Sequence, residues 1–381
     1  MVYKEIRPYQ VCKSCVMDTT DSKIVFDNNG ICDHCNTFHQ SIKPFWNQEH
    51  GEPEKVKAIV AKIKQWGKNK DYDCLLGMSG GIDSSYLLYY AVVKLGLRPL
   101  VFHIDTGWNT ELSTNNVKVL VERLGLKLHT VKIDWEEMAD LQIAFLKSGV
   151  SHIDTPQDHA CFATMYRFAS EYNIPYILTG GNYSTECVRN PKEWMYYQSD
   201  VRQLKDIHSK FGKKPLRKFP LTNILWHKFY LPYIKGVKLI RLLDYLPYHK
   251  EEAISTLESY GFKRYPQKHF ENFFTKWYES YWLYERFGYD VRKVQLSSLI
   301  LTNQMTRNEA LDILKTKPYN PETIVEDTKF VANKLGITYD ELMGYMKSEK
   351  KTYKDYKSQE EIYNIGAKIL HMLRIEKGGK R

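Results

Sequence analysis

The sequence predicts an α/β fold with a parallel sheet, a cysteine-rich N-terminal segment and a mostly helical C-terminal region. Short apolar runs alternate with helical patterns between residues 53 and 180. Four of the seven cysteines fall within the first 50 residues, and from about residue 183 an aromatic-rich, helical pattern replaces the alternation. Short buried strands separated by helices of this length indicate βαβ units, in which helices cover both faces of the sheet.

The expected elements follow from the period of the apolar residues. Residues 53–67 have apolar positions at helical spacing, and "DCLLGMS", "RPLVFHID", "KLHTVKID" and "PYILTG" are typical of buried strands. Further helices are expected at 84–95, 113–124, 135–148 and 160–173. A chain of 381 residues is long for one domain, so we expect three parts, covering residues 1–50, 51–187 and 188–381.

The bulk composition indicates a soluble protein. Hydrophobic residues make up 43% of the chain and charged residues 26%, which is ordinary for a globular domain. The sequence has neither an apolar run long enough to span a membrane nor a secretory signal pattern. We therefore expect a cytoplasmic location, where thiols stay reduced and cysteines are available as ligands or core residues.

The net charge of +10 is concentrated in runs at 212–218, 347–357 and 374–381. Such runs attract the phosphate backbone of nucleic acids. No RNA-binding or helix-turn-helix pattern accompanies them, so we interpret the charge as solvated lysine faces that also attract an anionic nucleotide or an acidic partner. Nucleic acid is not expected among the partners.

The stretch "CLLGMSGGIDSS" (74–85) places a glycine-rich turn between a buried strand and a helix. Glycines let the backbone turn tightly around an anion, and the helix start presents free N–H groups to it. Three serines add hydroxyl donors, and Asp83 is placed to orient the loop or help hold Mg²⁺. A nest of this kind suits pyrophosphate without the lysine of a Walker-type loop.

This loop matches the S-G-G-x-D-S loop of the PP-loop ATP pyrophosphatases, whose fold is adenine nucleotide α-hydrolase-like. "VFHIDTGWN" (101–109) resembles that superfamily's second strand, whose end borders the adenine, and "ILTGGNYSTE" (177–186) resembles the strand and loop that face the phosphates. The resemblance implies cleavage of ATP to AMP and pyrophosphate, which activates a carbonyl oxygen by adenylation. It implies ATP contacts at Ser79, Gly80, Gly81, Asp83, Ser84, Ser85, Asp105, Gly180 and Gly181.

Four cysteines near the N-terminus form the pattern C-x2-C-x16-C-x2-C. Each C-x-x-C pair can place two thiolates on one ion, and four thiolates complete a closed tetrahedron. The pattern predicts a structural zinc site, with an iron–sulfur cluster as the lesser alternative. Its ligands are Cys12, Cys15, Cys32 and Cys35.

Taken together, the head, loop and tail resemble the N-acetyl sugar amidotransferases, a PP-loop family of bacterial surface-polysaccharide synthesis. The segments concerned are "CKSCVMDTT", "FDNNGICDHC", "KHFENFFTKWY" and "VQLSSLILTNQMTRNEAL". The resemblance implies an ATP-dependent C–N ligase that converts an acetamido group on a sugar, expected to be nucleotide-linked, into an acetamidino group. It also implies ammonia from a separate glutaminase, and the chain itself shows no glutaminase nucleophile motif.

Several residues are candidates for the chemistry, each beside a structural alternative. Asp105 either contacts nucleotide or Mg²⁺ or closes a turn. Cys161 and the aromatic stripe at 273–281 are interpreted as core. The residues expected to act in catalysis follow a strand end or cluster in the tail: Asp83, Asn182, Glu186, Lys268 and His269.

Two other functions stay open. PP-loop enzymes that thiolate tRNA also carry C-x-x-C pairs and use catalytic cysteines, but Cys161 has no clear partner thiol in the sequence. A nucleotide-binding zinc protein without catalytic activity is the third alternative. Replacement of Cys161 by serine distinguishes the amidotransferase from the tRNA-thiolating enzyme, because only the thiolating enzyme needs that sulfur.

Overall fold

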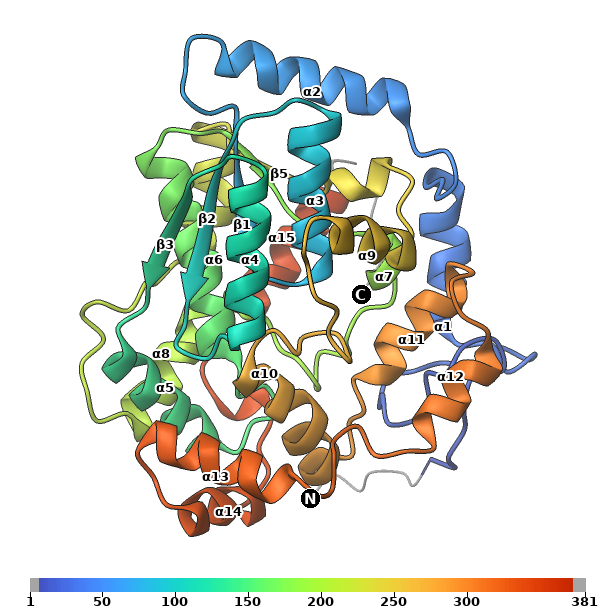
Figure 1. Cartoon of the computed structure of the whole chain (residues 1–381). Coiled ribbons are helices and arrows are strands. Elements are labelled where there is room, and N and C mark those ends of the chain that lie inside the picture. Colours follow the sequence, from blue (N-terminus) through green and yellow to red (C-terminus); the bar gives the residue numbers. More distant parts are fainter. Residues whose placement is uncertain (1–6, 373–381) are drawn as a thin grey trace.

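The computed structural model of the chain describes residues 7–372 (Figure 1). Its centre is a parallel sheet of five strands in the order β3-β2-β1-β4-β5. Within the sheet Cys74 pairs with Pro99 and Leu76 pairs with Leu178, so β1 lies between β2 and β4. The strands are β1 (Cys74–Met78), β2 (Pro99–Asp105), β3 (Leu128–Lys132), β4 (Tyr176–Leu178) and β5 (Lys238–Ile240).

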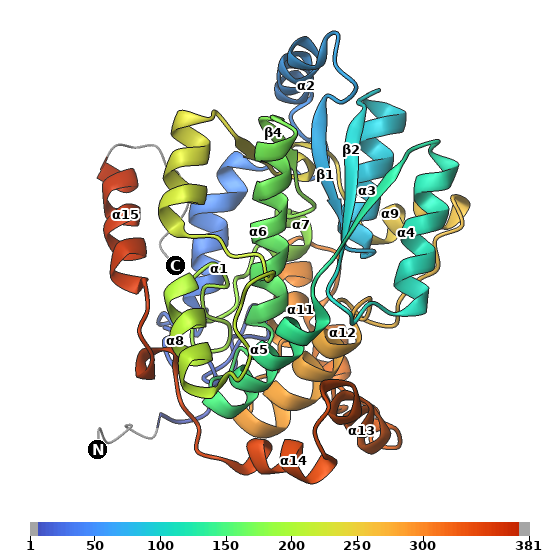
Figure 2. The same cartoon turned by 90° about the vertical axis from the view of Figure 1, so that its left-hand side faces the viewer.

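Alternate side chains of the strands enter two separate cores, as the two-residue period of a strand requires. Leu76 and Val101 pack with helices α2, α3, α4 and α9 on one face, whereas Leu75 and Phe102 pack with α6 and η4 on the other. Figures 1 and 2 show α3 and α4 on one side of the sheet and α6 on the opposite side. The expected α/β fold, with both faces of a parallel sheet covered, is confirmed.

Most expected helices are present at the expected places. Helices at 53–67 and 135–148 were expected with the bounds that the structure shows, and the others differ by a few residues at their ends. The helices of the core are α2 (Pro53–Gly67), α3 (Ile82–Tyr89) continued by η3 (Tyr90–Lys94), α4 (Glu111–Arg123), α5 (Trp135–Ser148), α6 (Thr155–Glu171) and α7 (Tyr183–Glu186).

The fifth strand was not expected. β5 pairs in parallel with β4, Tyr176 lying opposite Lys238, so the sheet is completed by residues beyond the range 51–187 expected for the core. Between β4 and β5 the chain forms α8 (Val201–Phe211) and η4 (Leu225–Ile234), and after β5 come η5 (Leu242–Tyr245) and α9 (Lys250–Ser259).

The rest of the C-terminal region is helical, as expected, and part of it packs on α5. The predicted core role of the aromatic stripe is confirmed, because Phe274, Trp277 and Tyr278 are fully buried and Phe273 and Tyr281 pack against the same core. The helices are α10 (Phe273–Trp277), η6 (Tyr278–Phe287), α11 (Arg292–Leu301), α12 (Arg307–Leu314), α13 (Ile324–Leu335), α14 (Tyr339–Lys347), η7 (Tyr353–Asp355) and α15 (Glu360–Met372).

The cysteine-rich N-terminal segment is mostly loop and contains α1 (Asp33–Thr37), η1 (Phe38–Ile42) and η2 (Lys43–Phe45). It docks on the C-terminal helices: the Val16 amide donates to Ser297 Oγ at 3.2 Å, and Lys293 forms an ion pair with the buried Asp18.

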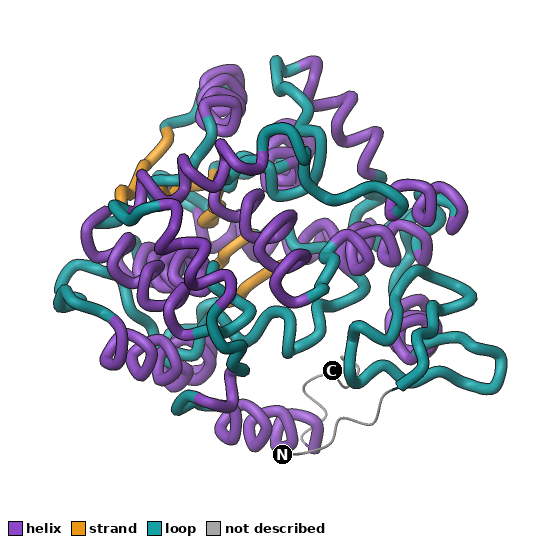
Figure 3. The backbone as a smooth tube through the Cα atoms, turned by 90° about the horizontal axis from the view of Figure 1, so that it is seen from below, coloured by secondary structure: helices purple, strands orange, loops and turns teal. Residues whose placement is uncertain are grey.

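Seen from below, helices make up most of the chain around a small group of strands (Figure 3).

None of the helices in residues 7–372 is long and apolar enough to cross a bilayer. The basic run at 374–381 lies outside the described residues.

Candidate active site and metal centre

The glycine-rich loop lies where β1 ends and α3 begins, at the carboxyl edge of the sheet. Gly80 has a φ of +88°, and a Cβ there would lie 2.2 Å from Ser113 Oγ. A Cβ on Gly81 would lie 2.8 Å from a carboxylate oxygen of Glu271. Gly80 is therefore needed for its backbone conformation, and a larger residue at Gly81 would require the Glu271 side chain to move.

Hydroxyl groups tie the loop into a compact turn. Ser79 Oγ lies 3.0 Å from Ser84 Oγ and accepts a hydrogen bond from the Gly81 amide at 3.1 Å. Ser84 and Ser85 are both buried, and Ser85 is completely enclosed at the start of α3. Ser79 is thus placed to present its hydroxyl to a ligand, and the first amides of α3 add the positive end of the helix dipole. The enclosed Ser85 side chain packs inside the molecule instead.

The carboxylate of Asp83, in the first turn of α3, is held by two donors. Asn182 Nδ2 donates to Asp83 Oδ1 at 3.1 Å, and the phenol of Tyr248 donates to the same oxygen at 2.5 Å. Burial, together with the negative charge of Asp83, raises the pKa of Tyr248 well above its usual value. The phenol therefore keeps its proton and remains a donor at every physiological pH.

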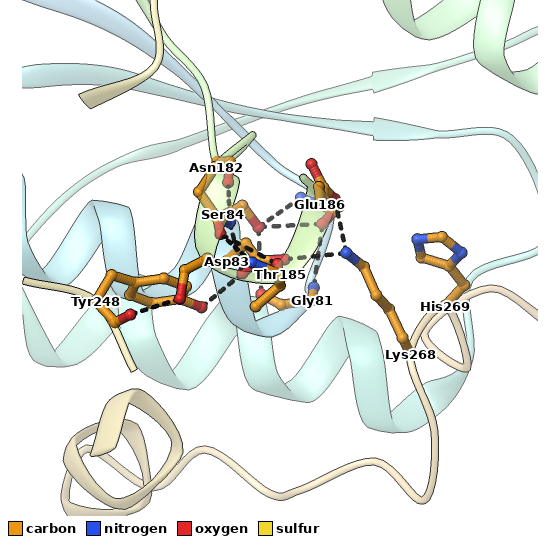
Figure 4. A network of polar contacts seen from close by, with 12 residues as sticks. Gly81, Asp83, Ser84, Asn182, Thr185, Glu186, Tyr248, Lys268 and His269 are labelled. Carbon is orange, nitrogen blue, oxygen red and sulfur yellow. Dashed lines mark hydrogen bonds and ion pairs between the residues drawn. The ribbon is translucent and has the colours of Figure 1, made fainter. Parts of the chain in front are cut away.

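Lys268 forms a bridge between two carboxylates. Its ammonium lies 2.6 Å from Glu186 Oε1 and 3.6 Å from Asp83 Oδ2 (Figure 4). Burial alone would lower the pKa of Lys268 and raise that of Glu186, but their mutual attraction outweighs burial and shifts both pKa values the other way. Lys268 and Glu186 are therefore both charged at neutral pH, beside the glycine-rich loop.

Asn182 lies at the N-terminus of α7 and is completely buried. Its side-chain oxygen accepts from the Thr185 amide at 2.8 Å, and its nitrogen donates to Asp83 and to the carbonyl of Gly180. These contacts make Asn182 a positioning residue that fixes Asp83. Gly180 allows the close approach, since a Cβ there would lie 2.9 Å from the Ser84 amide, whereas Gly181 faces Arg241 and Glu186.

Asp105 lies at the end of β2, away from the bridge at Lys268. Its carboxylate accepts from the Gly107 amide at 2.9 Å and from Asn109 Nδ2 at 3.3 Å, which is the turn geometry typical of aspartate. The structure thus brings together Asp83, Asn182, Glu186 and Lys268, and places Asp105 at a separate hollow of about 310 Å³ with Trp135 and Lys334.

His269 lies next to Lys268 in the chain but points to a different partner. Its Nδ1 lies 2.8 Å from Glu279 Oε1. Burial would lower the pKa of His269, but Glu279 raises it to about 9. The imidazole is therefore protonated at neutral pH and cannot accept a proton there, so the structure favours an ion-pairing role over the proton transfer that the sequence suggested.

Three further residues of the site were missed in the sequence. Tyr248, Arg241 and Lys250 come from the stretch after β5, whereas Glu271, which lies over the loop, belongs to the tail cluster with Lys268 and His269 that the sequence had singled out. Burial lowers the pKa of Lys250, and the nearby charge of Lys268 lowers it further. No motif in the sequence marks the three missed residues.

The segment that carries Lys268 and Glu271 crosses the glycine-rich loop. Hydrogen bonds to the residues that follow β2 hold it there. The Thr110 amide donates to the Glu271 carbonyl at 3.1 Å, and the Phe273 amide donates to the Trp108 carbonyl at 2.8 Å. Tyr265 donates to the Gly80 carbonyl at 2.9 Å. The C-terminal region therefore closes over the glycine-rich loop. Residues of the sheet core and of the C-terminal region form the site together.

The four N-terminal cysteines converge as expected, and all are buried. The sulfurs of Cys12 and Cys35 lie 3.8 Å apart, and Cys32 lies 3.6 Å from both Cys15 and Cys35. A tetrahedral zinc ion with Zn–S bonds of about 2.3 Å separates its sulfurs by about 3.8 Å, so the four thiols fit one zinc ion. Arg307 donates to the carbonyls of Cys12 and Cys15 and so braces the first C-x-x-C loop.

The remaining cysteines are poor candidates for catalysis. Burial raises the pKa of Cys161 to about 12 and that of Cys187 to about 12, and it raises the pKa of the buried Cys74 further. Because the thiolate is the nucleophile, these groups are unreactive at neutral pH. This disfavours a thiolating enzyme and agrees with the interpretation of Cys161 as a structural residue.

The sheet order, with an S-G-G-x-D-S loop at the end of its central strand, agrees with the PP-loop ATP pyrophosphatase fold that the sequence resembles. Residues 271–370 match the family model described as "LPS biosynthesis protein WbpG-like, C-terminal domain". This match lies in the tail, where the sequence resembled enzymes of surface-polysaccharide synthesis, and it confirms that resemblance for this part of the chain.

Two solved structures are similar at 17% identity. The NH3-dependent NAD synthetase from Campylobacter jejuni subsp. jejuni NCTC 11168, in complex with the nitrate ion, matches over 57% of this chain and 99% of its own, with a TM-score of 0.28. The NMN synthetase from Francisella tularensis matches over 56% and 99%, with a TM-score of 0.25. Because both TM-scores are low, the fold assignment rests on the sheet order and the loop of this chain, and not on these two structures. No curated protein with a similar sequence was found.

We predict that the chain binds one zinc ion and that Cys32→Ser abolishes this binding, because three thiolates leave the tetrahedron open. Metal analysis of the purified proteins measures the change. Cys161→Ser is the control and should keep its zinc. Wild-type protein purified without zinc, or equal zinc in the Cys32→Ser variant, would contradict the prediction.

A second prediction concerns the ion pair of His269 and Glu279. The folded-state pKa of about 9 exceeds the usual value of 6.5, so the pair stabilises the protein fully below the lower value and loses its effect as pH rises through the higher one. His269→Gln should therefore lower the Tm at about pH 6 but hardly at about pH 10.

Thermal unfolding across this pH range measures the difference, with the exposed His50→Gln as the matched control. A Tm difference that stays constant with pH would show that His269 stabilises the fold by packing alone.

Proposed function

We propose that the protein is an ATP-dependent amidotransferase that converts the acetamido group of a sugar into an acetamidino group. The observation that carries the proposal is the closure of the tail over the phosphate loop, with Lys268 beside Asp83 and Glu186. The tail is also the part that matches a lipopolysaccharide-biosynthesis domain. The arrangement thus joins an ATP-cleaving loop to a region associated with polysaccharide synthesis.

The proposed reaction has two steps. The oxygen of the acetamido carbonyl attacks the α-phosphorus of ATP, and the bond to the β-phosphate breaks, which releases pyrophosphate and leaves an adenylated imidate. Ammonia then attacks the imidate carbon, and AMP leaves with the former amide oxygen. The adenylation is necessary because an amide carbonyl is a poor electrophile with a poor leaving group.

The polar and charged groups of the site suit the first step, in which pyrophosphate leaves. The amide groups at the start of α3 and the hydroxyl of Ser79 would hold the departing pyrophosphate, and Lys268 would neutralise its charge. Asp83 and Glu186 would hold Mg²⁺, which draws negative charge from the phosphates when bound. The fit is supported by Lys268, since its ammonium is already shared between both carboxylates, in the way that a cation would be.

The substrate proposed is an acetamido sugar carried by a nucleotide, destined for lipopolysaccharide O-antigen or nonulosonate synthesis. Ammonia would come from a separate glutaminase, because free ammonia at neutral pH is mostly protonated to ammonium, which is not a nucleophile. Much of the enzyme's contribution would then be positioning, since three reactants must be aligned at one carbon.

The mechanism predicts the fate of one oxygen atom. With an acetamido sugar labelled by ¹⁸O at the amide carbonyl, the label should appear in AMP, while the labelled sugar loses about three daltons as ¹⁸O is replaced by NH (about one dalton for the unlabelled sugar). Lys268→Met should lower the rate about 100-fold, the usual loss for one electrostatic group at a transition state. Lys263→Met, at an exposed position in the same segment, is the control.

Mass spectrometry of sugar and nucleotide products reads both results. Formation of ADP and orthophosphate, or recovery of the label in pyrophosphate or water, would refute the proposed reaction.

The nitrogen source gives a separate prediction. The purified chain should turn over with high ammonium at alkaline pH, where more free ammonia is present, but hardly with glutamine. Addition of the glutaminase partner should restore activity with glutamine at neutral pH. Efficient glutamine-dependent turnover by the isolated chain would refute the need for a partner.

A further inference from the structure

A segment before the site has an unusual composition. From Ile207 to Leu243 the chain has no Asp or Glu. In the same stretch it has nine basic residues: Lys210, Lys213, Lys214, Arg217, Lys218, Lys228, Lys235, Lys238 and Arg241. Neither the fold nor the proposed reaction uses most of these charges, so the segment calls for a separate explanation.

The middle of this segment is η4, the yellow helix beside α6 in Figure 2. One side of η4 faces the sheet, where Leu231 and His227 are buried. The other side exposes apolar residues: Leu225 is 67% exposed, Phe229 60% and Ile234 63%. Large apolar side chains exposed together on one surface are uncommon on a monomer unless they meet a partner.

The exposed residues gather in one place. Seven of the seventeen large hydrophobic side chains that are exposed in residues 7–372 lie between residues 221 and 239. We call them the apolar patch: Leu221, Leu225, Phe229, Tyr230, Tyr233, Ile234 and Leu239. The rings of Phe229 and Tyr233 lie 5.7 Å apart, and the Val237 amide bonds to the Leu231 carbonyl, which holds the start of β5 against η4.

Three lysines border the apolar patch. Lys228, Lys235 and Lys238 are exposed, and none forms an ion pair within the described part of the chain, whereas Lys214 and Lys218 are neutralised by Glu136 and Asp134. The uncompensated charge is therefore next to the exposed apolar side chains.

We propose that the apolar patch and its three lysines dock the protein on a membrane surface that contains anionic lipids. Protruding aromatic and aliphatic side chains with lysines at the border are the features of segments that lie in the lipid headgroup region, and each lysine adds attraction to anionic lipid. A second copy of the chain is a poorer occupant, because a self-complementary contact brings like charges of the same segment together. The proposal does not depend on the proposed reaction.

Sedimentation with lipid vesicles tests the proposal on the full chain. The protein should bind vesicles of phosphatidylcholine mixed with phosphatidylglycerol, and bind phosphatidylcholine vesicles far more weakly. The triple variant Lys228→Gln, Lys235→Gln, Lys238→Gln should lose about 100-fold in affinity, from about a factor of five for each lysine. Leu225→Ser with Phe229→Ser should also weaken binding, and this loss should persist at high salt.

Matched controls separate the surface from general charge and hydrophobicity. Lys57→Gln, Lys62→Gln, Lys68→Gln removes equal charge from α2 and its C-cap, and Val93→Ser with Val325→Ser removes two exposed apolar groups elsewhere. Both should bind like wild type, and circular dichroism should show that all variants are folded.

Three results would overturn the proposal. These are no binding of wild type to the anionic vesicles, equal losses in test and control variants, or a dimer in light scattering that Leu225→Ser with Phe229→Ser dissociates while vesicle binding is unchanged.

Discussion

The carboxylate of Asp83 is where four separate segments of the chain meet. Asp83 itself begins α3, Asn182 comes from the loop after β4, Tyr248 precedes α9, and Lys268 comes from the tail. A partly buried carboxylate is costly unless it is paired and hydrogen-bonded. The need to satisfy this one charge therefore fixes the relative positions of the core and the C-terminal region, and with them the geometry of the site.

The N-terminal cysteine centre is linked to the same place from the other side. Val16 bonds to Ser297 on α11, Ser298 of the same helix accepts from the Val188 amide, and Thr302 donates to the Ser184 carbonyl in α7. The helix α11 thus lies between the metal centre and the helix that Asn182 caps. A structural ion at the cysteines would stiffen the support of the site without entering its chemistry.

The phosphate loop and the cysteine centre were predictable because their requirements are local. Gly80 is needed by the turn of its own backbone, and cysteine pairs need two intervening residues to reach one ion. Tyr248 was not predictable, since its role arises only when a distant segment folds against the loop. For His269 the sequence suggested a proton-transfer role, whereas in the structure its ring pairs with Glu279 of η6, a contact that arises only on folding.

The fifth strand was missed for a related reason. β5 has only three residues and is largely exposed, so it lacks the buried apolar run by which the other strands were recognised. It nevertheless covers the edge of β4 along Tyr176–Leu178. A chain that ended at Cys187, where the sequence pattern of the core stops, would leave the backbone groups of β4 unpaired. Such an open edge is a template for strand-to-strand aggregation, so the sheet core and its tail are expected to be inseparable in solution.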